Sequence, residues 1–190
     1  MPEIIDPRLL LVKVARLLDK LKIRYLVTGG MAVFVWGRPR FTADIDIVVQ
    51  MQNTDIGALA DQLARLSKAS YISREAMRHA LARFGEFNFI DGASGIKVDF
   101  FVSRKELFEE QKLARRVRRK ILAYNVYFIS PEDLILSKLR WHQQGESIKQ
   151  LEDIESILRI QKKLDWKYLR KWATIHKTLA VLNSLKKRPS

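Results

Sequence analysis

One stretch of the chain alternates acidic and apolar side chains, and it limits the fold more than any other feature. Residues 44–49 read Asp-Ile-Asp-Ile-Val-Val, a composition typical of a β-strand. Because side chains along a strand alternate between its two faces, Asp44 and Asp46 share one face, while the isoleucines that follow them point into a core. The stretch therefore predicts a strand with one buried apolar face and two carboxylates roughly 6.5–7 Å apart on the other.

Those two carboxylates need a neutralising partner, because like charges on a mostly buried strand cost stability. A hard divalent cation would remove that cost, since carboxylate oxygens suit Mg²⁺ or Mn²⁺. A third acid, Asp99, lies in a second apolar stretch at residues 97–101. We therefore predict that Asp44, Asp46 and Asp99 form one metal-binding cluster, in which two metal ions about 3.5–4 Å apart could drive an in-line phosphoryl displacement. The alternative for Asp99 is a hydrogen bond to a backbone turn or a salt bridge with an arginine.

A pair of glycines precedes the acidic strand. Gly29 and Gly30 follow the apolar run at residues 25–28 and come before a short helical stretch at residues 31–36. Glycines let backbone N–H groups converge on an anion, and a helix N-terminus adds a favourable partial charge. Any tight turn could give a strand, two glycines and a helix. The position of this turn upstream of the acids favours a site for the phosphates of a nucleotide.

The rest of the pattern predicts an α/β (α+β) fold, with a mixed sheet flanked by helices and a helical C-terminal third. We expect helices over residues 7–22, 31–36, 53–66, 73–83, 131–142, 148–160 and 166–185, and strands over 25–28, 44–50, 87–90, 96–101, 117–122 and 126–129. The character of the sequence changes near Ser130, where a capping serine precedes Pro131. Residues 1–130 are therefore assigned to the α/β core, and residues 131–190 to a helical region packed on it.

Charge and composition point to a polyanionic partner. The chain has 35 Lys and Arg against 21 Asp and Glu, a net charge of +14, which attracts nucleic acid, nucleotides or an anionic surface. A lysine-rich surface without such a partner is the alternative. The chain has no cysteine, which excludes disulfides and thiolate zinc sites. With no long apolar run and an acidic N-terminus, we expect a soluble, cytoplasmic protein without a membrane partner.

The motifs together resemble the nucleotidyltransferase superfamily that includes DNA polymerase beta. The resemblance is carried by residues 26–30, by Asp44-Ile45-Asp46 after a gap of thirteen residues (31 to 43), and by Asp99. The run at residues 40–46 also resembles the Arg-x-(Ser/Thr)-x-Asp-x-Asp block of abortive-infection-type nucleotidyltransferases, known as toxins of type IV toxin–antitoxin systems. Many members have Ser where Gly30 stands. The resemblance covers about residues 25–158, because residues 131–139 and 149–154 look like the family's two later helical motifs.

This resemblance implies a role for each candidate residue. Asp44 and Asp46 would hold the metal ions that bridge a nucleoside triphosphate such as ATP, and Asp99 would help to deprotonate the acceptor hydroxyl. The residues expected to bind the nucleotide are Gly29, Gly30, Arg40, Thr42, Lys138 and Asp153. For three of these the residues themselves leave alternatives: a surface lysine at 138, an exposed helical acid at 153, and an arginine at 40 that only neutralises the acidic strand.

The predicted function is transfer of a nucleoside monophosphate from a nucleoside triphosphate to a hydroxyl, with Mg²⁺ or Mn²⁺. The acceptor would be a tRNA 3′ end or a protein, and the resemblance adds a toxin–antitoxin or phage-defence setting with a cognate antitoxin as partner. The basic run at residues 115–120 would either track an RNA backbone or protect an edge strand. Two other functions stay open: a non-catalytic member that binds nucleotide or nucleic acid, and a two-metal nuclease or phosphatase.

Overall fold

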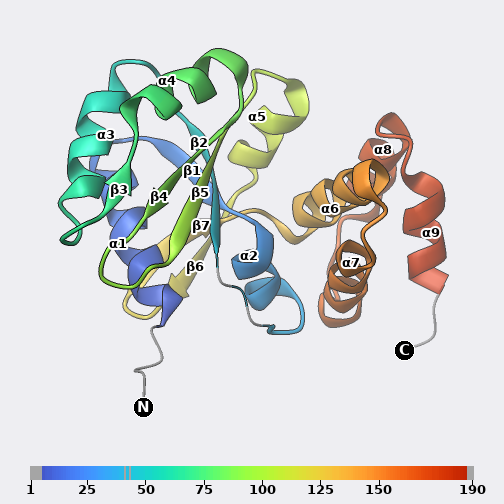
Figure 1. The fold of residues 1–190 in the computed structure, drawn as a ribbon. Helices are drawn as coiled ribbons and strands as arrows, with labels where there is room; N and C mark the ends of the chain where they lie inside the picture. Colours follow the sequence, from blue (N-terminus) through green and yellow to red (C-terminus); the bar gives the residue numbers. More distant parts are fainter. Residues whose placement is uncertain (1–5, 41, 43, 188–190) are drawn as a thin grey trace.

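A mixed β-sheet forms one half of the molecule, and helices from the C-terminal third stand beside it (Figure 1). The computed structural model describes residues 6–40, 42 and 44–187, so Phe41 and Ala43 of the acidic motif lie outside the described residues. Within this part of the chain the sheet has seven strands in the order β3-β4-β5-β2-β1-β7-β6. Its strands are β1 (Arg24–Val27), β2 (Ile45–Gln50), β3 (Tyr71–Ile72), β4 (Glu86–Ile90), β5 (Lys97–Val102), β6 (Val117–Ile121) and β7 (Tyr124–Phe128).

Helices fall into two groups around this sheet. Those of the N-terminal part are α1 (Pro7–Lys20), α2 (Gly29–Trp36), α3 (Asp55–Ala64), α4 (Arg74–Arg83) and α5 (Leu107–Ala114). Those of the C-terminal third are α6 (Pro131–Gly145), α7 (Ile148–Ile160), α8 (Trp166–Ile175) and α9 (Leu179–Lys187). The predicted α/β class with a helical C-terminal third is confirmed. Whether residue 130 separates two domains stays a prediction. None of the helices in the described part of the chain is long and apolar enough to cross a bilayer.

The two faces of the sheet differ in chemistry. On β2 and β5 the inward side chains are fully or almost fully buried aliphatic and aromatic residues, and helices α1, α3 and α4 cover that face (Figure 1). Phe100 of β5 stacks there on Phe87 of β4, with ring centroids 4.9 Å apart. The opposite face carries Asp46 and Asp99 and turns toward α2 and α6. The strand alternation thus places the core and the acids on opposite sides, as the sequence predicts.

Helix α2 joins the sheet to the C-terminal helices. The indole N–H of Trp36 donates a hydrogen bond to the carbonyl of Ile129 at 2.8 Å, just before α6 begins. The Gln161 side chain, at the end of α7, donates to the carbonyl of Trp36 at 2.6 Å. Helix α6 starts as expected, with the Ser130 hydroxyl accepting a hydrogen bond from the Asp133 amide at 3.1 Å. These bonds fix α6 and α7 next to the face of the sheet that carries the acids.

Several boundaries differ from the prediction. Helix α2 begins at Gly29 and not at residue 31, so both glycines belong to its first turn. The expected single helix over residues 166–185 is two helices, because Lys177 adopts a left-handed conformation (φ 60°) between α8 and α9. The β6–β7 turn was predicted at residues 124–125 but lies at residues 122–123, with Leu122 at φ 52°. Strand β3 and helix α5 were not predicted.

Candidate active site

Asp46 is enclosed by the glycine turn that precedes α2. Gly29 has φ +58°, and a Cβ atom on it would lie 1.8 Å from Oδ2 of Asp46, so only glycine fits this position without a shift of that carboxylate. The Gly30 amide donates a hydrogen bond to the Asp46 carboxylate. The Thr28 amide donates to the Asp46 carbonyl at 2.9 Å, which joins the end of β1 to β2. The amide of Gly30, expected to bind phosphate, is bonded to Asp46 here, so its phosphate role stays a prediction.

Asp99 lies directly beside Asp46. Strands β2 and β5 are parallel, and Asp46 and Asp99 are register partners across them. Burial raises the pKa of Asp46, and the negative charge of Asp99 raises it further, against the hydrogen bond from Gly30. Asp44 lies one residue before β2 begins, and its side chain is 47% exposed. The structure therefore brings two of the predicted acids together on the sheet and leaves the third at the rim.

Lys97 is a charged residue at this site that the sequence analysis did not single out. Its ammonium lies 2.8 Å from Oδ2 of Asp99 and 3.9 Å from Oδ2 of Asp44. The hydrogen bond to Asp99 raises the pKa of Lys97. Asp99 therefore has a salt bridge, as its alternative reading allowed, but with a lysine and not with an arginine. The available signal was the strand period, which places residues 97 and 99 on one face.

Lys138 and Asp153 form a buried pair behind the carboxylates. Lys138 on α6 is 2% exposed, and its ammonium donates to Asp153 at 2.7 Å and to Gln150 at 2.9 Å. Arg40 donates through Nε and Nη2 to the same Asp153 carboxylate, at 2.8 and 2.9 Å. Lys138 is thus not a surface lysine, and Asp153, at 4% exposure, is not an exposed acid. Arg40 pairs with Asp153, although the charge of Asp46 also raises the pKa of Arg40.

Opposite influences set the pKa values of this pair. Burial lowers the pKa of Lys138, and the hydrogen bond to Asp153 opposes that effect without cancelling it. For Asp153 burial acts to raise the pKa, but the hydrogen bonds from Arg40 and Lys138 outweigh it and hold the pKa below its usual range. Lys138 also interacts electrostatically with Asp46. Lys138 of α6 therefore interacts electrostatically with Asp46 while its ammonium is hydrogen-bonded to residues of α7.

Thr42 packs on the glycine turn. A Cβ atom on Gly30 would lie 2.5 Å from the hydroxyl oxygen of Thr42, so the second glycine is also restricted in size. The Thr42 hydroxyl donates a hydrogen bond to the carbonyl of Asp44 at 3.1 Å. Thr42 therefore supports the backbone that carries the acids. Its predicted contact with nucleotide is not tested by these bonds.

The carboxylates match a divalent metal in kind. They are oxygen donors on one face of the sheet, and burial, together with the negative charge of Asp99, raises the pKa of Asp46. As they stand, no three Asp, Glu, His or Cys side chains of the described residues converge tightly enough to hold a metal ion. One oxygen of Asp99 is taken by Lys97. The residues therefore fit the metal in their chemistry, while Asp99 would have to exchange its partner.

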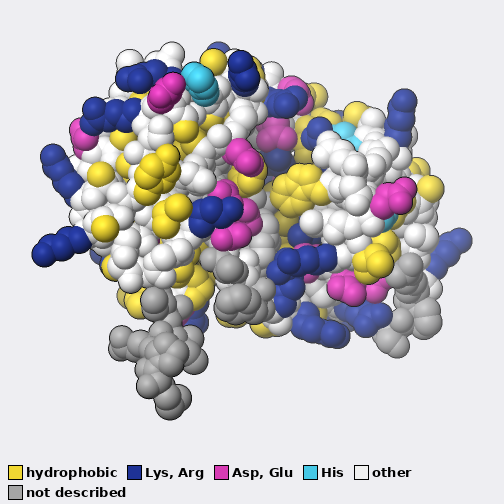
Figure 2. Space-filling model, in the orientation of Figure 1, with side chains coloured by type: hydrophobic (Ala, Val, Ile, Leu, Met, Phe, Trp, Pro, Cys, Tyr) yellow, Lys and Arg dark blue, Asp and Glu magenta, His cyan; other side chains and the backbone are white. Residues whose placement is uncertain are grey.

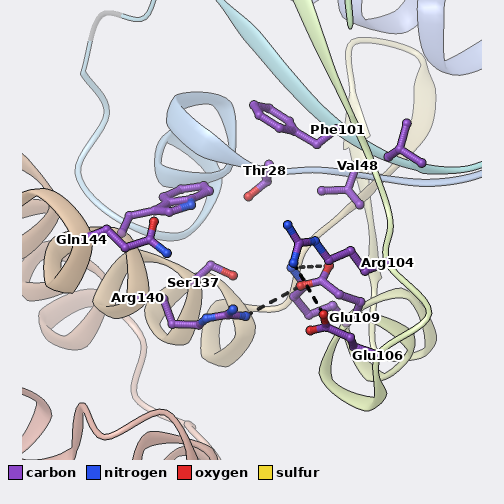
Figure 3. Close-up of a pocket in the computed structure, with 12 residues that line it drawn as sticks. Thr28, Val48, Phe101, Arg104, Glu106, Glu109, Ser137, Arg140 and Gln144 are labelled. Carbon is purple, nitrogen blue, oxygen red and sulfur yellow. Dashed lines mark ion pairs between the residues drawn. The ribbon is translucent and has the colours of Figure 1, made fainter. Parts of the chain in front are cut away.

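A pocket of about 250 Å³ lies next to the acids, between the sheet and α6 (Figure 3). Val48 and Phe101 line it, and each follows an acid by two residues on the same strand, so the pocket lies on the same face. Charged side chains on its far wall are paired with one another: Arg140 lies 3.9 Å from Glu109 (Figure 3). The hydroxyl of Ser137 is buried in this wall and has no hydrogen-bond partner among the described residues. Acidic side chains gather in the middle of the molecular face, with basic side chains on both sides (Figure 2).

The basic run at residues 115–120 divides between two roles. Arg115 caps α5 and pairs with Glu132 at 3.2 Å, so it belongs to the interior contacts and not to the strand. Arg116 and Arg118 both lie over the ring of Tyr127, so they share a face. Arg118 and the two residues after it are exposed on the edge strand β6. This exposed part is compatible with either predicted role, RNA contact or edge protection.

Comparisons with known proteins identify a family and a shared fold. A family model described as nucleotidyltransferase of unknown function (DUF6036) matches residues 9–188. No curated protein matches the chain significantly. An antigenic nucleotidyltransferase-like protein from Paracoccidioides brasiliensis has a similar structure, with a TM-score of 0.55 and 21% identity over 95% of this chain and 92% of that one.

Two further similar structures contain bound small molecules. ANT(2'')-Ia in complex with adenylyl-2''-tobramycin has a TM-score of 0.62 and 15% identity, and the match covers 90% of this chain and 97% of that one. The lincosamide antibiotic adenylyltransferase LnuA, bound to lincomycin, has a TM-score of 0.54 and 14% identity, over 83% of this chain and 98% of that one. At these identities the likeness concerns the fold.

Proposed function

This chain belongs to the family of nucleotidyltransferases described as DUF6036, and from that premise we propose that it transfers a nucleoside monophosphate from a nucleoside triphosphate to a hydroxyl acceptor, with Mg²⁺ or Mn²⁺. The observation that supports this most is the side-by-side position of Asp46 and Asp99 on parallel strands, with the glycine turn packed on Asp46. Two adjacent carboxylates on the face of the sheet that borders a pocket suit the binding of a cation and the activation of a hydroxyl. A nuclease or phosphatase would not need the glycine turn.

Asp44, Asp46 and Asp99 would hold the metal. When bound, it would offset the charge that develops on the α-phosphate and on the leaving pyrophosphate. Asp99 would accept the proton of the acceptor hydroxyl, since it faces the pocket side of the sheet and its side chain is only 18% exposed. Asp153 would keep Lys138 in place, close enough to Asp46 to act on its charge. Gly29, Gly30, Arg40 and Thr42 would shape the phosphate end of the site.

We favour an RNA 3′ end as the acceptor. The net charge of +14 and the exposed basic residues 118–120 on an edge strand support a polyanionic partner. A tRNA end, a protein hydroxyl and a small hydroxylated compound are three arms of the same test. The small compound is included because ANT(2'')-Ia and LnuA were crystallised with adenylyl-2''-tobramycin and lincomycin. A setting in toxin–antitoxin or phage-defence systems, with a cognate antitoxin, remains part of the proposal.

The test is transfer of label. The protein is incubated with Mg²⁺ or Mn²⁺, with each α-labelled nucleoside triphosphate in turn, and with total tRNA, cell protein or small hydroxylated compounds. Wild type is expected to label one acceptor class, and Asp46→Asn to reduce the rate roughly 10²–10³-fold. Asp61→Asn is the control, because Asp61 is an exposed acid on α3 that pairs with Arg74. Equal rates in wild type and Asp46→Asn would contradict the proposal.

A second outcome would favour the non-catalytic alternative. If no acceptor is labelled, yet the protein binds nucleotide or RNA, the chain is a binding member of the family. A binder of nucleic acid alone should keep its affinity in Asp46→Asn, whereas metal-dependent nucleotide binding should be lost. A binder of nucleic acid and a metal-dependent binder of nucleotide therefore respond differently to Asp46→Asn.

A further inference from the structure

The ammonium of Lys97 lies where the predicted metal site needs a cation. It is 2.8 Å from Oδ2 of Asp99 and 3.9 Å from Oδ2 of Asp44, two of the three acids assigned to the metal. A metal such as Mg²⁺ binds a carboxylate oxygen at roughly 2.0–2.1 Å. An ammonium hydrogen-bonded to that oxygen and a metal ion bound to it would place two positive charges within a few ångströms of each other. The repulsion between the two charges favours the departure of one of them.

Lys97 is the cation that can leave. Its side chain is 39% exposed, so its ammonium can turn into water without crossing the protein interior. Lys138, another cation near these acids, has a side chain that is only 2% exposed and is held by Asp153 and Gln150. The two lysines therefore differ in freedom, although both act on the same acidic strand.

We infer that Lys97 is a built-in competitor of the metal: its ammonium neutralises Asp99 and Asp44 in the metal-free protein and is displaced when a divalent cation binds. This inference rests on the proposed function, because it concerns the same metal site. The ion pairs of Lys97 would reduce the repulsion between Asp44 and Asp99 when no metal is bound. It also makes Lys97 the residue that sets the metal affinity, since binding includes the cost of breaking the Lys97–Asp99 ion pair.

The inference is tested by metal binding without nucleotide. Mn²⁺ is titrated into wild type, Lys97→Met and Lys97→Arg, and free Mn²⁺ is measured by electron paramagnetic resonance. Lys97→Met removes the charge and keeps an unbranched side chain of similar length. Mn²⁺ should therefore bind about fivefold more tightly, which corresponds to the loss of a partly exposed ion pair. Lys97→Arg keeps the competing charge and should stay close to wild type. Lys20→Met, an exposed lysine on α1 across the sheet, controls for net charge and should not change the affinity.

A second measurement separates competition from a loss of folding. Without metal, Lys97→Met leaves Asp44 and Asp99 unpaired, so its melting temperature should fall below that of wild type. Saturating Mn²⁺ should then raise the melting temperature of Lys97→Met by more than that of wild type. An affinity in Lys97→Met equal to or weaker than wild type would overturn the inference.

The outcomes also distinguish this inference from the proposed function. If wild type binds Mn²⁺ and Asp46→Asn does not, while Lys97→Met binds as wild type does, the metal site stands and the competitor role fails. If neither wild type nor Lys97→Met binds Mn²⁺, the metal site itself fails and both proposals are overturned. Tighter binding in Lys97→Met that is lost again in Lys97→Met/Asp46→Asn supports both.

Discussion

Two acids of the candidate site, Asp46 on β2 and Asp153 on α7, have opposite electrostatic surroundings. Burial and the neighbouring Asp99 raise the pKa of Asp46, whereas hydrogen bonds from Arg40 and Lys138 hold the pKa of Asp153 low despite its burial. Asp153 has two cations as direct partners, and Asp46 has a backbone amide and a second acid beside it. The same residue type is therefore paired with two cations at position 153 and placed beside a second acid at position 46.

From this difference we expect Asp153 to contribute more to stability and Asp46 more to the proposed chemistry. A carboxylate whose charge is fully met by the protein holds its neighbours in place, and its loss leaves buried cations behind. A carboxylate beside a like charge costs stability until a cation arrives, and such perturbed groups mark functional sites more often than structural ones. The comparison can be tested by three substitutions, which should differ in both size and sign.

The largest effect is expected for Asp153→Ala. It leaves the Lys138 ammonium buried without its negatively charged partner, because a side chain that is 2% exposed cannot reach water. The free energy of unfolding should fall by about 3–5 kcal/mol. Urea unfolding followed by circular dichroism measures this. The double variant Lys138→Met/Asp153→Leu removes both charges and should recover most of the loss; if it is as unstable as the single variant, the charge argument is wrong.

An intermediate effect is expected for Gly29→Ala. The new Cβ atom would lie 1.8 Å from Oδ2 of Asp46, in a residue with φ +58°, so the free energy of unfolding should fall by roughly 2–4 kcal/mol. Gly95→Ala is the matched control, since Gly95 has φ +69° and open space around it. That variant should lose only about 1–2 kcal/mol from backbone strain. Equal losses in the two variants would mean that contact with Asp46 has no cost.

The smallest effect, of opposite sign, is expected for Asp46→Asn. Without metal this variant should be more stable than wild type at neutral pH by roughly 0.5–1 kcal/mol, because it removes a charge beside Asp99 and keeps an oxygen for the Gly30 amide. Since the folded pKa of Asp46 is raised, its cost is present above that pKa and fades as pH falls toward about 3.9. The advantage of Asp46→Asn should therefore shrink on acidification. Unfolding between pH 4 and pH 8 measures it, and a variant less stable than wild type at pH 7 would contradict this view of Asp46.

Local sequence signals were sufficient for much of the fold. The Asp6-Pro7 pair marks the start of α1, with the Asp6 carboxylate accepting from the Arg8 amide at 2.9 Å. Residues 148–160 form α7 with the predicted ends, because their apolar period is regular and a serine precedes them. The alternation in β2 and β5 also placed Asp46 and Asp99 on the face away from the core. Their chemical roles remain predictions from the motif.

The features that the sequence did not predict depend on tertiary contacts and backbone conformation. Asn125 favours a turn, but the hydroxyl of Tyr124 donates to Asp19 of α1 at 2.6 Å, which keeps this part of the chain in β7 and moves the turn to residues 122–123. The break before α9 has no glycine or proline, and it depends on the left-handed Lys177. The approach of Lys97 to Asp44 became visible only once strand register placed β5 beside β2. Register between distant strands has no local signature.

Helix α2 has a mechanical consequence for the molecule. Its first turn touches Asp46 through Gly29 and Gly30, and its last residue, Trp36, is bonded both to the start of α6 and to the end of α7. A helix of eight residues is a stiff strut of about 12 Å. Helix α2 therefore connects the Asp46 carboxylate to α6, which lines the pocket, and to α7. We expect a shift of that carboxylate to be passed along this one short element toward the pocket wall.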